Sequence, residues 1–146
     1  MNIRLTDVTQ DIVDKVIALK VKEDQKDLTQ DITHFLSQPN VEQDLRPLAI
    51  YHAEELVGFC VYGTDDEDGR VWIQTLIISA AHQGKGYSRM ALEELINIIR
   101  RERNPAAIFA CIREKNTAAQ ALFQKLKFSS TAEKEGDADV WTLSFE

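Results

Sequence analysis

The chain has 146 residues, of which 44% are hydrophobic and 28% are charged, and its formal net charge is −7 at pH 7. This length fits one domain, and the acidic balance argues against nucleic acid and anionic membrane surfaces as partners while suiting a cationic small molecule. The lack of a long apolar run and the position of Cys60 and Cys111 in apolar, strand-like segments predict a cytoplasmic protein with reduced core thiols.

The first part of the chain predicts one short strand and two helices. Residues 2–6 alternate between apolar and polar side chains, as a half-buried strand does. A helix with one apolar face is expected to begin near Thr9. A second helix should begin at Asp27 and must end before Pro39. The charged residues 22–27 between the two helices are expected to form a solvated joint.

Three strands are then expected to run back and forth as an antiparallel meander. Residues 41–46 are typical of a polar linker, and Pro47 opens the first strand, which covers residues 48–52. A tight turn over residues 53–55 returns the chain into a second strand at 56–63.

An acidic turn and a third strand complete the meander. Residues 64–69 contain four acidic side chains and end in the hairpin signal Asp68-Gly69. Two interpretations of this turn remain open, a solvated loop tip or a segment that attracts a polycation. The third strand covers residues 70–79, and its pleat is expected to separate Trp72, Gln74, Leu76 and Ile78 from Val71, Ile73, Thr75 and Ile77.

Residues 82–90 form a glycine-spaced turn between this strand and the next helix. Gly84 and Gly86 let a phosphate approach the main chain, and the start of the helix adds a partial positive charge. The turn therefore predicts an anion site, with a purely structural corner as the alternative. Spacing excludes two nucleotide motifs, because no Ser or Thr follows Lys85 as in a P-loop, and Arg89 replaces the third glycine of a dinucleotide fingerprint.

The last part of the chain predicts a helix, a strand, a second helix and a hairpin. The helix at 91–101 ends at an Asn-Pro pair, and residues 106–112 form an apolar strand expected to lie parallel to the strand before the turn. Asn116 caps the second helix, and strands at 128–131 and 140–145 flank an acidic turn. The residues expected to face the core are Leu92, Leu95, Ile96 and Ile99 in the first helix and Ala119, Leu122, Phe123 and Leu126 in the second.

Two segments follow each other in an order and at a distance typical of one superfamily. Gln83-Gly84-Lys85-Gly86-Tyr87-Ser88 resembles the Gln/Arg-x-x-Gly-x-Gly/Ala signature of the GNAT superfamily of N-acetyltransferases, with Ser88 in place of Gly or Ala. Residues 116–128 resemble the downstream block Asn-x-x-Ala-x-x-Leu-Tyr-x-x-x-Gly-Phe. The resemblance implies the GNAT acyl-CoA N-acyltransferase fold, an α/β (α+β) mixed sheet in the order β-α-α-β-β-β-α-β-α-β-β, and one domain over residues 1–146.

By this resemblance, acetyl-CoA is the co-substrate and binds the turn and the strand before it. In the family the turn amides cradle the pyrophosphate, and the strand carries a bulge beside the thioester and splays from its neighbour. The main chain of the strand pairs with the pantetheine arm, and the amide of Leu76 is the expected oxyanion donor. The expected CoA-binding residues are Leu76, Ile77, Ile78, Gln83, Gly84, Lys85, Gly86, Tyr87, Ser88, Asn116 and Phe123, and no metal is implied.

The resemblance also implies where an acceptor amine binds. In the family the first helical pair roofs the acceptor pocket, so Glu23 and Asp24 are candidates for holding an ammonium group. Trp72 and Gln74 would face the acceptor, with a core aromatic and an edge amide as the alternative interpretation. Residues 56–63 and 69–73 look like the bacterial spermine/spermidine acetyltransferase group, which often has an acidic residue where this chain has Gln74.

The chemistry of amine acetylation asks for a base, an oxyanion donor and an acid. An alkyl ammonium, with a pKa of about 10, must lose a proton before its nitrogen attacks the thioester. The family usually protonates the leaving thiolate from a tyrosine, but this chain has Phe123 at that position. The leaving thiolate would then take its proton from solvent or from another group, or it would leave without help from an acid. Other titratable groups that the sequence leaves unplaced are Tyr87, Tyr62, His82, His52 and His34.

The sequence therefore predicts an acetyl-CoA-dependent N-acetyltransferase that acetylates a primary amine by direct attack in a ternary complex. The expected acceptor is a polyamine such as spermidine or spermine. One alternative is a GNAT-fold module that binds an acyl-CoA or a protein with little turnover. Another is an acetyltransferase for an aminoglycoside, peptide or protein amine. Family members are often dimers, so the resemblance also leaves a homodimer open.

Overall fold

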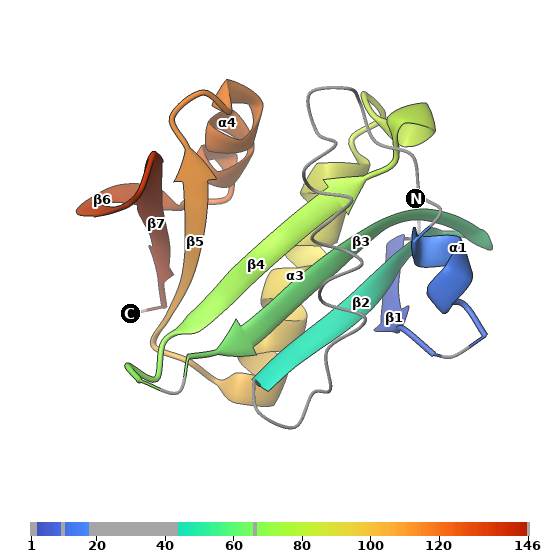
Figure 1. Ribbon diagram of the computed structural model, residues 1–146, viewed down its shortest axis with the longest axis horizontal. Helices are drawn as coiled ribbons and strands as arrows, with labels where there is room; N and C mark the ends of the chain where they lie inside the picture. Colours follow the sequence, from blue (N-terminus) through green and yellow to red (C-terminus); the bar gives the residue numbers. More distant parts are fainter. Residues whose placement is uncertain (1–2, 10, 18–43, 66, 146) are drawn as a thin grey trace.

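The computed structural model describes residues 3–9, 11–17, 44–65 and 67–145, and within them seven strands form one mixed sheet (Figure 1). The elements are β1 (Ile3–Asp7), α1 (Val13–Ile17), β2 (Asp44–His52), β3 (Glu55–Thr64), β4 (Val71–Ile78), the 3-10 turn η2 (Ala80–His82), α3 (Tyr87–Arg103), β5 (Ala107–Arg113), α4 (Thr117–Lys125), β6 (Ser129–Glu135) and β7 (Ala138–Ser144). The strand order is β1-β2-β3-β4-β5-β7-β6, and among these described strands only the neighbours β4 and β5 run parallel. The predicted α/β fold is confirmed, while the predicted second helix, residues 27–38, lies outside the described residues.

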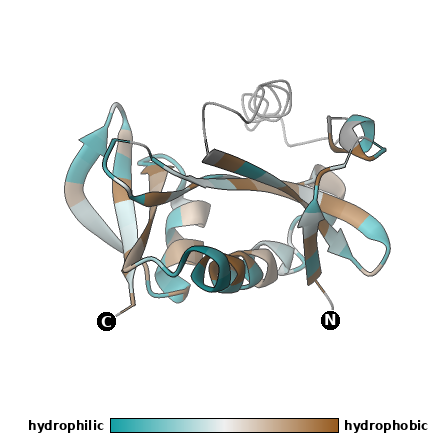
Figure 2. Ribbon diagram, turned by 90° about the horizontal axis from the view of Figure 1, so that it is seen from below, coloured by the Kyte–Doolittle hydropathy of each residue, from teal (hydrophilic) through white to brown (hydrophobic). Residues whose placement is uncertain are grey.

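Helix α3 covers one face of the sheet, and α1 lies against the other face (Figure 2). Apolar residues recur in α3 at intervals of three and four, so one side of the helix packs on the strands. The helix begins at Tyr87, earlier than predicted, and ends where Asn104 adopts a left-handed conformation with φ 47°. The buried residues of α3 are Tyr87, Ala91, Leu92, Leu95, Ile98 and Ile99, whereas the predicted Ile96 is only partly buried.

A smaller apolar cluster lies on the α1 face of the sheet. It joins Val16 of α1 to Phe59 and Val61 of β3 and to Ile77 of β4. Between these strands, Gly58 cannot be replaced without a shift, because a Cβ there would lie 2.3 Å from the carbonyl oxygen of Ile77. The tight contact between β3 and β4 therefore depends on this glycine.

Strand β2 begins earlier than predicted. It starts at Asp44, so part of the expected linker is strand, and Pro47 lies inside the strand opposite Val61. The ladder between β1 and β2 ends where Asp7 pairs with Leu48. Within the described residues, Pro47 therefore lies beyond β1, at an edge where its missing N–H leaves no β1 partner unbonded.

The C-terminal hairpin is longer than predicted. Strand β6 continues to Glu135 and β7 begins at Ala138, so the stretch expected to be an acidic turn is mostly strand. The turn itself has two residues, of which Gly136 has φ 62°. Because β6 is an edge strand with almost every residue exposed, it lacks the apolar alternation that marks a strand in sequence.

The two cysteines differ in burial. Cys60 is fully buried, as predicted. Cys111 is exposed, so the prediction of a core thiol was wrong at this position. Its neighbours Ala110 and Ile112 face the α3 side of the sheet, and the alternation of β5 turns Cys111 to the other side. Among the described residues, no helix is long and apolar enough to cross a membrane.

Candidate active site

Strand β4 parts from β5 along its length (Figure 1). The two strands pair only over residues 71–73 of β4. Gln74 then forms a β-bulge against β3, because Ile73 and Thr75 pair with consecutive β3 residues. A bulge bends its strand and increases the local twist. From Gln74 onward, the described residues of β4 and β5 diverge without a ladder between them.

The main-chain groups of Leu76 and Ile78 face this divergence. The N–H of Ser79 donates to the Val57 carbonyl of β3 at 2.8 Å. Hydrogen-bonded positions alternate along an antiparallel pair, so every second residue of β4 turns its N–H and C=O toward β3. Leu76 and Ile78 fall on the other set and turn theirs toward the β5 side. The Ile78 carbonyl accepts a hydrogen bond from the side-chain amide of Gln83 at 2.8 Å.

The bulge also changes which face each β4 side chain occupies. Ile73 packs in the α3-side cluster before the bulge, and Leu76 and Ile78 pack there after it. Ile77 packs on the opposite, α1 side. The predicted pleat, which grouped Leu76 and Ile78 with Gln74, was therefore wrong beyond the bulge, because one inserted residue shifts the two-residue alternation.

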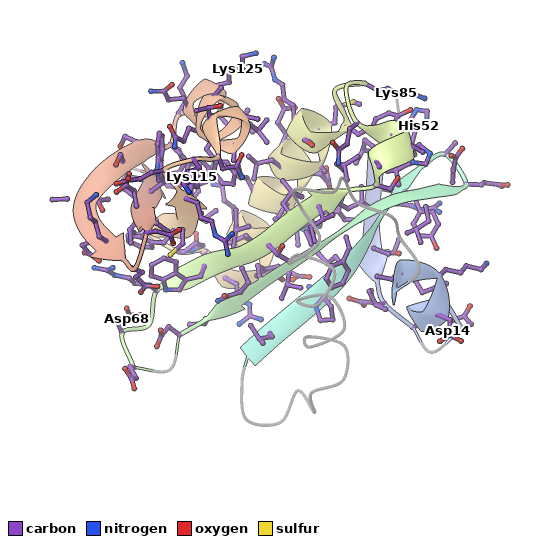
Figure 3. The ribbon with its side chains drawn as sticks, turned by 45° about the horizontal axis from the view of Figure 1, so that its top comes forward. Asp14, His52, Asp68, Lys85, Lys115 and Lys125 are labelled. Carbon is purple, nitrogen blue, oxygen red and sulfur yellow. The ribbon has the colours of Figure 1, made fainter. Side chains whose placement is uncertain are left out.

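The turn between η2 and α3 has the geometry of an anion site. Gly84 and Gly86 have φ 80° and 81°, and a Cβ added at either would meet no heavy atom within 4 Å. Gly86 precedes the 17 residues of α3, whose first turn has no acidic residue and no side-chain cap within the described chain. The N–H groups at this helix start thus carry partial positive charge toward an incoming anion. Lys85 lies on the turn, at the opposite end of β4 from Asp68 (Figure 3).

Helix α4 follows β5 at the wide end of the divergence (Figure 1). The Asn116 side chain accepts a hydrogen bond from the Ala119 N–H at 3.1 Å, so the predicted cap is confirmed. Phe123 is 6% exposed and packs edge-on against Phe128, with 4.9 Å between ring centroids. Phe123 therefore contributes packing at this position and has no proton to donate.

The hydroxyls of Tyr62 and Tyr87 contact other groups. Tyr62 is fully buried, and its hydroxyl lies 3.1 Å from Arg46 and contacts Glu102, to which Arg46 is also ion-paired. The Tyr87 hydroxyl lies 3.3 Å from Nδ1 of His52, within hydrogen-bond distance. These contacts fix the positions of both hydroxyls in the fold.

A hollow of about 300 Å³ lies at the end of β4 where β4 still pairs with β5. Trp72 of β4 and Cys111 of β5 line it. The residues before and after each of them in sequence belong to the α3-side cluster, so Trp72 and Cys111 point to the opposite face of the sheet. The hollow therefore opens on the face away from α3. Its lining residues are Asp65, Asp68, Arg70, Trp72, Ile73, Gln74, Cys111, Glu133 and Glu135.

Negative charge dominates this hollow, whose described lining has four carboxylates and one guanidinium. The guanidinium of Arg70 is paired, because its terminal nitrogens lie 2.9 and 3.0 Å from the two Glu133 oxygens. The hydrogen bond from Arg70 lowers the pKa of Glu133 below its ordinary value. Burial, and then Glu135, raise the pKa of Cys111 to about 11, so a neutral thiol lines the hollow at pH 7. The surplus carboxylates suit a cationic ligand.

Glu133 and Glu135 were not predicted as site residues. They fell in the stretch expected to be a turn, whereas in β6 they stand two positions apart and share one face. Their spacing becomes a signal only once β6 is known to be a strand. Asp65 and Asp68, in the turn proposed to attract a polycation, do line the same hollow.

The remaining predicted residues fall into two groups along β4. Residues 76–78 and 83–88 lie along the diverging half of β4 and the turn that follows, and Asn116 is the N-cap of α4. Trp72 and Gln74 line the hollow, and the Trp72 indole N–H is buried without a hydrogen-bond partner in the described chain. The predicted acceptor residues Glu23 and Asp24, and also His34, lie outside the described residues.

Known proteins resemble this chain in sequence. A model of the acetyltransferase (GNAT) family matches residues 11–128. A Bacillus subtilis (strain 168) protein described as a spermine/spermidine N(1)-acetyltransferase is 28% identical over 139 residues, which cover 91% of this chain and 91% of that protein. The similarity therefore extends over nearly the whole of both chains.

Solved structures share the fold. A Vibrio cholerae spermidine N-acetyltransferase, in complex with CoA and spermine, has a TM-score of 0.75 at 14% identity, with 97% of this chain and 95% of that chain covered. The aminoglycoside acetyltransferase AAC(6')-Ib, in complex with coenzyme A, has a TM-score of 0.80 at 13% identity, with 98% and 95% covered. At these identities the likeness is one of fold.

Proposed function

The chain belongs to the acetyltransferase (GNAT) family, and from this premise we propose that it is an acetyl-CoA-dependent N-acetyltransferase whose acceptor is a polycationic primary amine such as spermidine or spermine. The observation that carries the proposal is the arrangement along β4. One end of this strand leads into an uncapped helix start, which suits an anion, and the other lines a hollow rich in carboxylates, which suits a cation.

The anion end fits CoA, which carries a pyrophosphate on an extended arm. Residues 83–88 would hold the pyrophosphate on their N–H groups, with Lys85 adding charge. The edge of β4 at Leu76 and Ile78 would pair with the amides of the pantetheine arm, as a free sheet edge pairs with an extended chain. The relatives solved in complex with coenzyme A support this assignment. When bound, acetyl-CoA supplies the acetyl group as a thioester.

The reaction needs one deprotonated amine nitrogen and one donor for the oxyanion. The ammonium would first lose one proton to solvent, and the neutral nitrogen would form the C–N bond while the C–S bond breaks and the thiolate leaves with the electron pair. The nitrogen would release its second proton to solvent, which gives the neutral amide. The Leu76 N–H, which faces the divergence as the Ile78 N–H does, would stabilise the oxyanion. Gln74 can accept a hydrogen bond from the amine but takes no proton from it. Thiolate departure needs no acid from Phe123, since a thiol with a pKa near 8.5 leaves readily as an anion.

The cation end would hold the ammonium groups that do not react. A polyamine carries several positive charges at neutral pH, and the surplus carboxylates of the hollow would bind those beyond the reacting nitrogen. The spermine/spermidine acetyltransferase of Bacillus subtilis, similar over 91% of the chain, supports this choice of acceptor.

A panel of amines tests the proposal. Thiol release from acetyl-CoA should be measured with polyamines, aminoglycosides and peptide amines as acceptors. We expect the highest kcat/KM with spermidine or spermine. Good turnover of a neutral or acidic amine, together with none of any polyamine, would refute the acceptor assignment and leave the acetyltransferase assignment standing.

A second candidate function rests on Gln74 and Phe123. Neither side chain offers a base or an acid, so a GNAT-fold module that binds an acyl-CoA without efficient turnover also fits these two residues. The same panel separates the two candidates. A module of this kind would bind CoA in a calorimeter yet release no thiol above the acceptor-free rate with any amine.

A further inference from the structure

The β2–β3 hairpin contacts the anion turn on both sides. His82 directly precedes the turn, and its Nε2 contacts the carboxylate of Glu55. Tyr87 follows Gly86 and begins α3, and its hydroxyl lies 3.3 Å from Nδ1 of His52, with 4.8 Å between the two rings. His52 and Glu55 are themselves paired across the hairpin turn. One hairpin end therefore contacts the residues on either side of Gln83 to Gly86.

His82 is the centre of this hairpin brace, which consists of Glu55, His82, His52 and Tyr87. Its side chain is only 16% exposed. With the proton on Nε2, the imidazole donates to Glu55, and Nδ1 accepts from the hydroxyl of Ser79 at 2.5 Å. Ser79 is buried, and its N–H is bonded to β3 at Val57. The imidazole thus ties the end of β4 to the start of β3 immediately before the turn.

Polar contacts join the turn to the β2–β3 hairpin, in addition to the packing of Tyr87 in the apolar core. Gly84, Lys85 and Gly86 are exposed, and both glycines have open space around them. The Gln83 side chain bonds the Ile78 carbonyl, and the side chains of His82 and Tyr87 join the flanking residues to the β2–β3 hairpin. The negative charge of Glu55 alone would weaken anion binding at the nearby turn. A favourable role of Glu55 in this site must therefore come from its contact with His82.

Resting on the proposed function, we propose that Glu55 and His82 are positioning residues for the pyrophosphate of CoA. The pair orients η2, and η2 orients the N–H groups of the turn before CoA arrives. Loss of the contact between the two residues frees the turn and lowers CoA affinity, whereas turnover with saturating CoA changes little, because the pair acts on the position of the turn and not on the reacting atoms.

Two neighbouring carboxylates give a matched test of the hairpin brace. Glu55→Ala and Glu54→Ala remove the same charge from the same turn, but Glu54 has no ion pair or hydrogen bond within the described chain. Calorimetry with CoA should show weaker binding for Glu55→Ala by roughly three- to tenfold, the range for a partly exposed charged hydrogen bond. Glu54→Ala should bind CoA as the wild type does or slightly more tightly. Glu55→Gln, which keeps an acceptor for His82, should recover most of the affinity.

Kinetics and a double variant show whether the effect passes through His82. With saturating CoA, kcat of Glu55→Ala should stay within about twofold of the wild type while KM for acetyl-CoA rises. Adding Glu55→Ala to His82→Ala should weaken CoA binding no further, because both changes remove one contact. Equal effects of Glu55→Ala and Glu54→Ala, or additive effects of Glu55→Ala and His82→Ala, would overturn the proposal.

Hydrogen exchange tests whether the hairpin brace orders the turn in the absence of CoA. In the free protein, amides 83–88 should exchange faster in Glu55→Ala than in Glu54→Ala or the wild type. If the wild type failed to bind CoA, the proposed function would be refuted. The exchange rates of amides 83–88 would still show whether Glu55 positions the turn. Unchanged exchange in Glu55→Ala would remove that role as well.

Discussion

The two ends of β4 obtain their chemistry in different ways. The anion turn at 83–88 consists of consecutive residues, and its geometry follows from two glycines at positive φ and the start of α3. The acidic hollow brings together side chains such as Arg70 and Glu133, which are 63 positions apart in the sequence. A site built from neighbours can be predicted from local chemistry alone. A site built by strand register becomes visible only when the sheet order is known.

The largest effect is expected at the anion turn. Gly86→Val adds a branched side chain at φ 81° in the open space before α3. CoA affinity should fall by about 100-fold, because the side chain would occupy the place of the phosphate and the helix start could no longer be approached. Calorimetry with CoA measures this loss.

Gly136→Val is the matched control for that change. Gly136 also has positive φ, 62°, and open space around it, but it lies in the β6–β7 turn. Both variants should lose roughly 1–2 kcal/mol of stability from backbone strain, and only Gly86→Val should lose CoA affinity. Equal CoA affinities in the two folded variants would contradict the assignment of the turn.

A smaller effect is expected in the acidic hollow. The double variant Asp65→Asn/Glu135→Gln removes two of its four carboxylates. KM for spermidine should rise by roughly tenfold while KM for acetyl-CoA stays nearly constant, since charges interact strongly only within about 10 Å at 0.1 M salt. Steady-state kinetics over both substrates measures the two constants separately.

Asp137→Asn supplies the comparison for the hollow. Asp137 is exposed in the β6–β7 turn and does not line the hollow, so its removal changes the net charge without changing the site. The wild-type KM for spermidine should also rise with salt, and less so in the double variant. Equal responses of Asp137→Asn and the double variant would mean that overall charge, not the hollow, attracts the amine.

The same contrast explains what the sequence could and could not predict. The end of α3 at the Asn104-Pro105 pair and the cap at Asn116 were predicted, because each depends on one or two residues and their immediate neighbours. The exposure of Cys111 was missed, since apolar flanks suggested burial while the strand alternates. The faces of β4 beyond Gln74 were also missed, because a bulge depends on the partner strand. The acidic residues of β6 gave no strand signal, since that strand buries almost nothing.

Phe123 of α4 can be tested by a substitution that is expected to increase activity. Phe123→Tyr places a hydroxyl where the wild type has a packed phenyl ring. If thiolate departure limits the rate, kcat should rise by a few-fold, below the roughly 100-fold usual for general acids, because the leaving group is already stable as an anion. The new acid should also appear as a loss of activity at high pH, where the phenol ionises.

Two outcomes separate the explanations for Phe123. No gain and no new limb in the pH profile would mean that departure does not limit the rate, and CoA affinity should then match the wild type. Abolished activity in a folded Phe123→Tyr protein would instead contradict a pure packing role and show that the ring shapes the pocket.

The smallest effect is a shift in the titration of Glu55. Its hydrogen bond with His82, then the charges of His82, Lys85 and His52, hold the pKa of Glu55 below its ordinary value of 4.5. A lowered carboxyl pKa contributes stability that is present above the ordinary value and is lost as pH falls through the folded value. NMR titration of the Glu55 carboxyl carbon should give a midpoint below 4.5. In His82→Ala the midpoint should move back up, and an unmoved midpoint would mean that the contact with His82 is absent in solution.

The central claim is that one strand joins an acetyl-CoA site to a polycation site. Its most direct test is to incubate the wild type with acetyl-CoA and spermidine, and to quantify free thiol and the mass of the amine product together. The account predicts one thiol released for each acetyl group found on spermidine, at a rate that falls in both Gly86→Val and Asp65→Asn/Glu135→Gln. Thiol release without acetylated amine, or an acetylated product formed equally well by both variants, would contradict it.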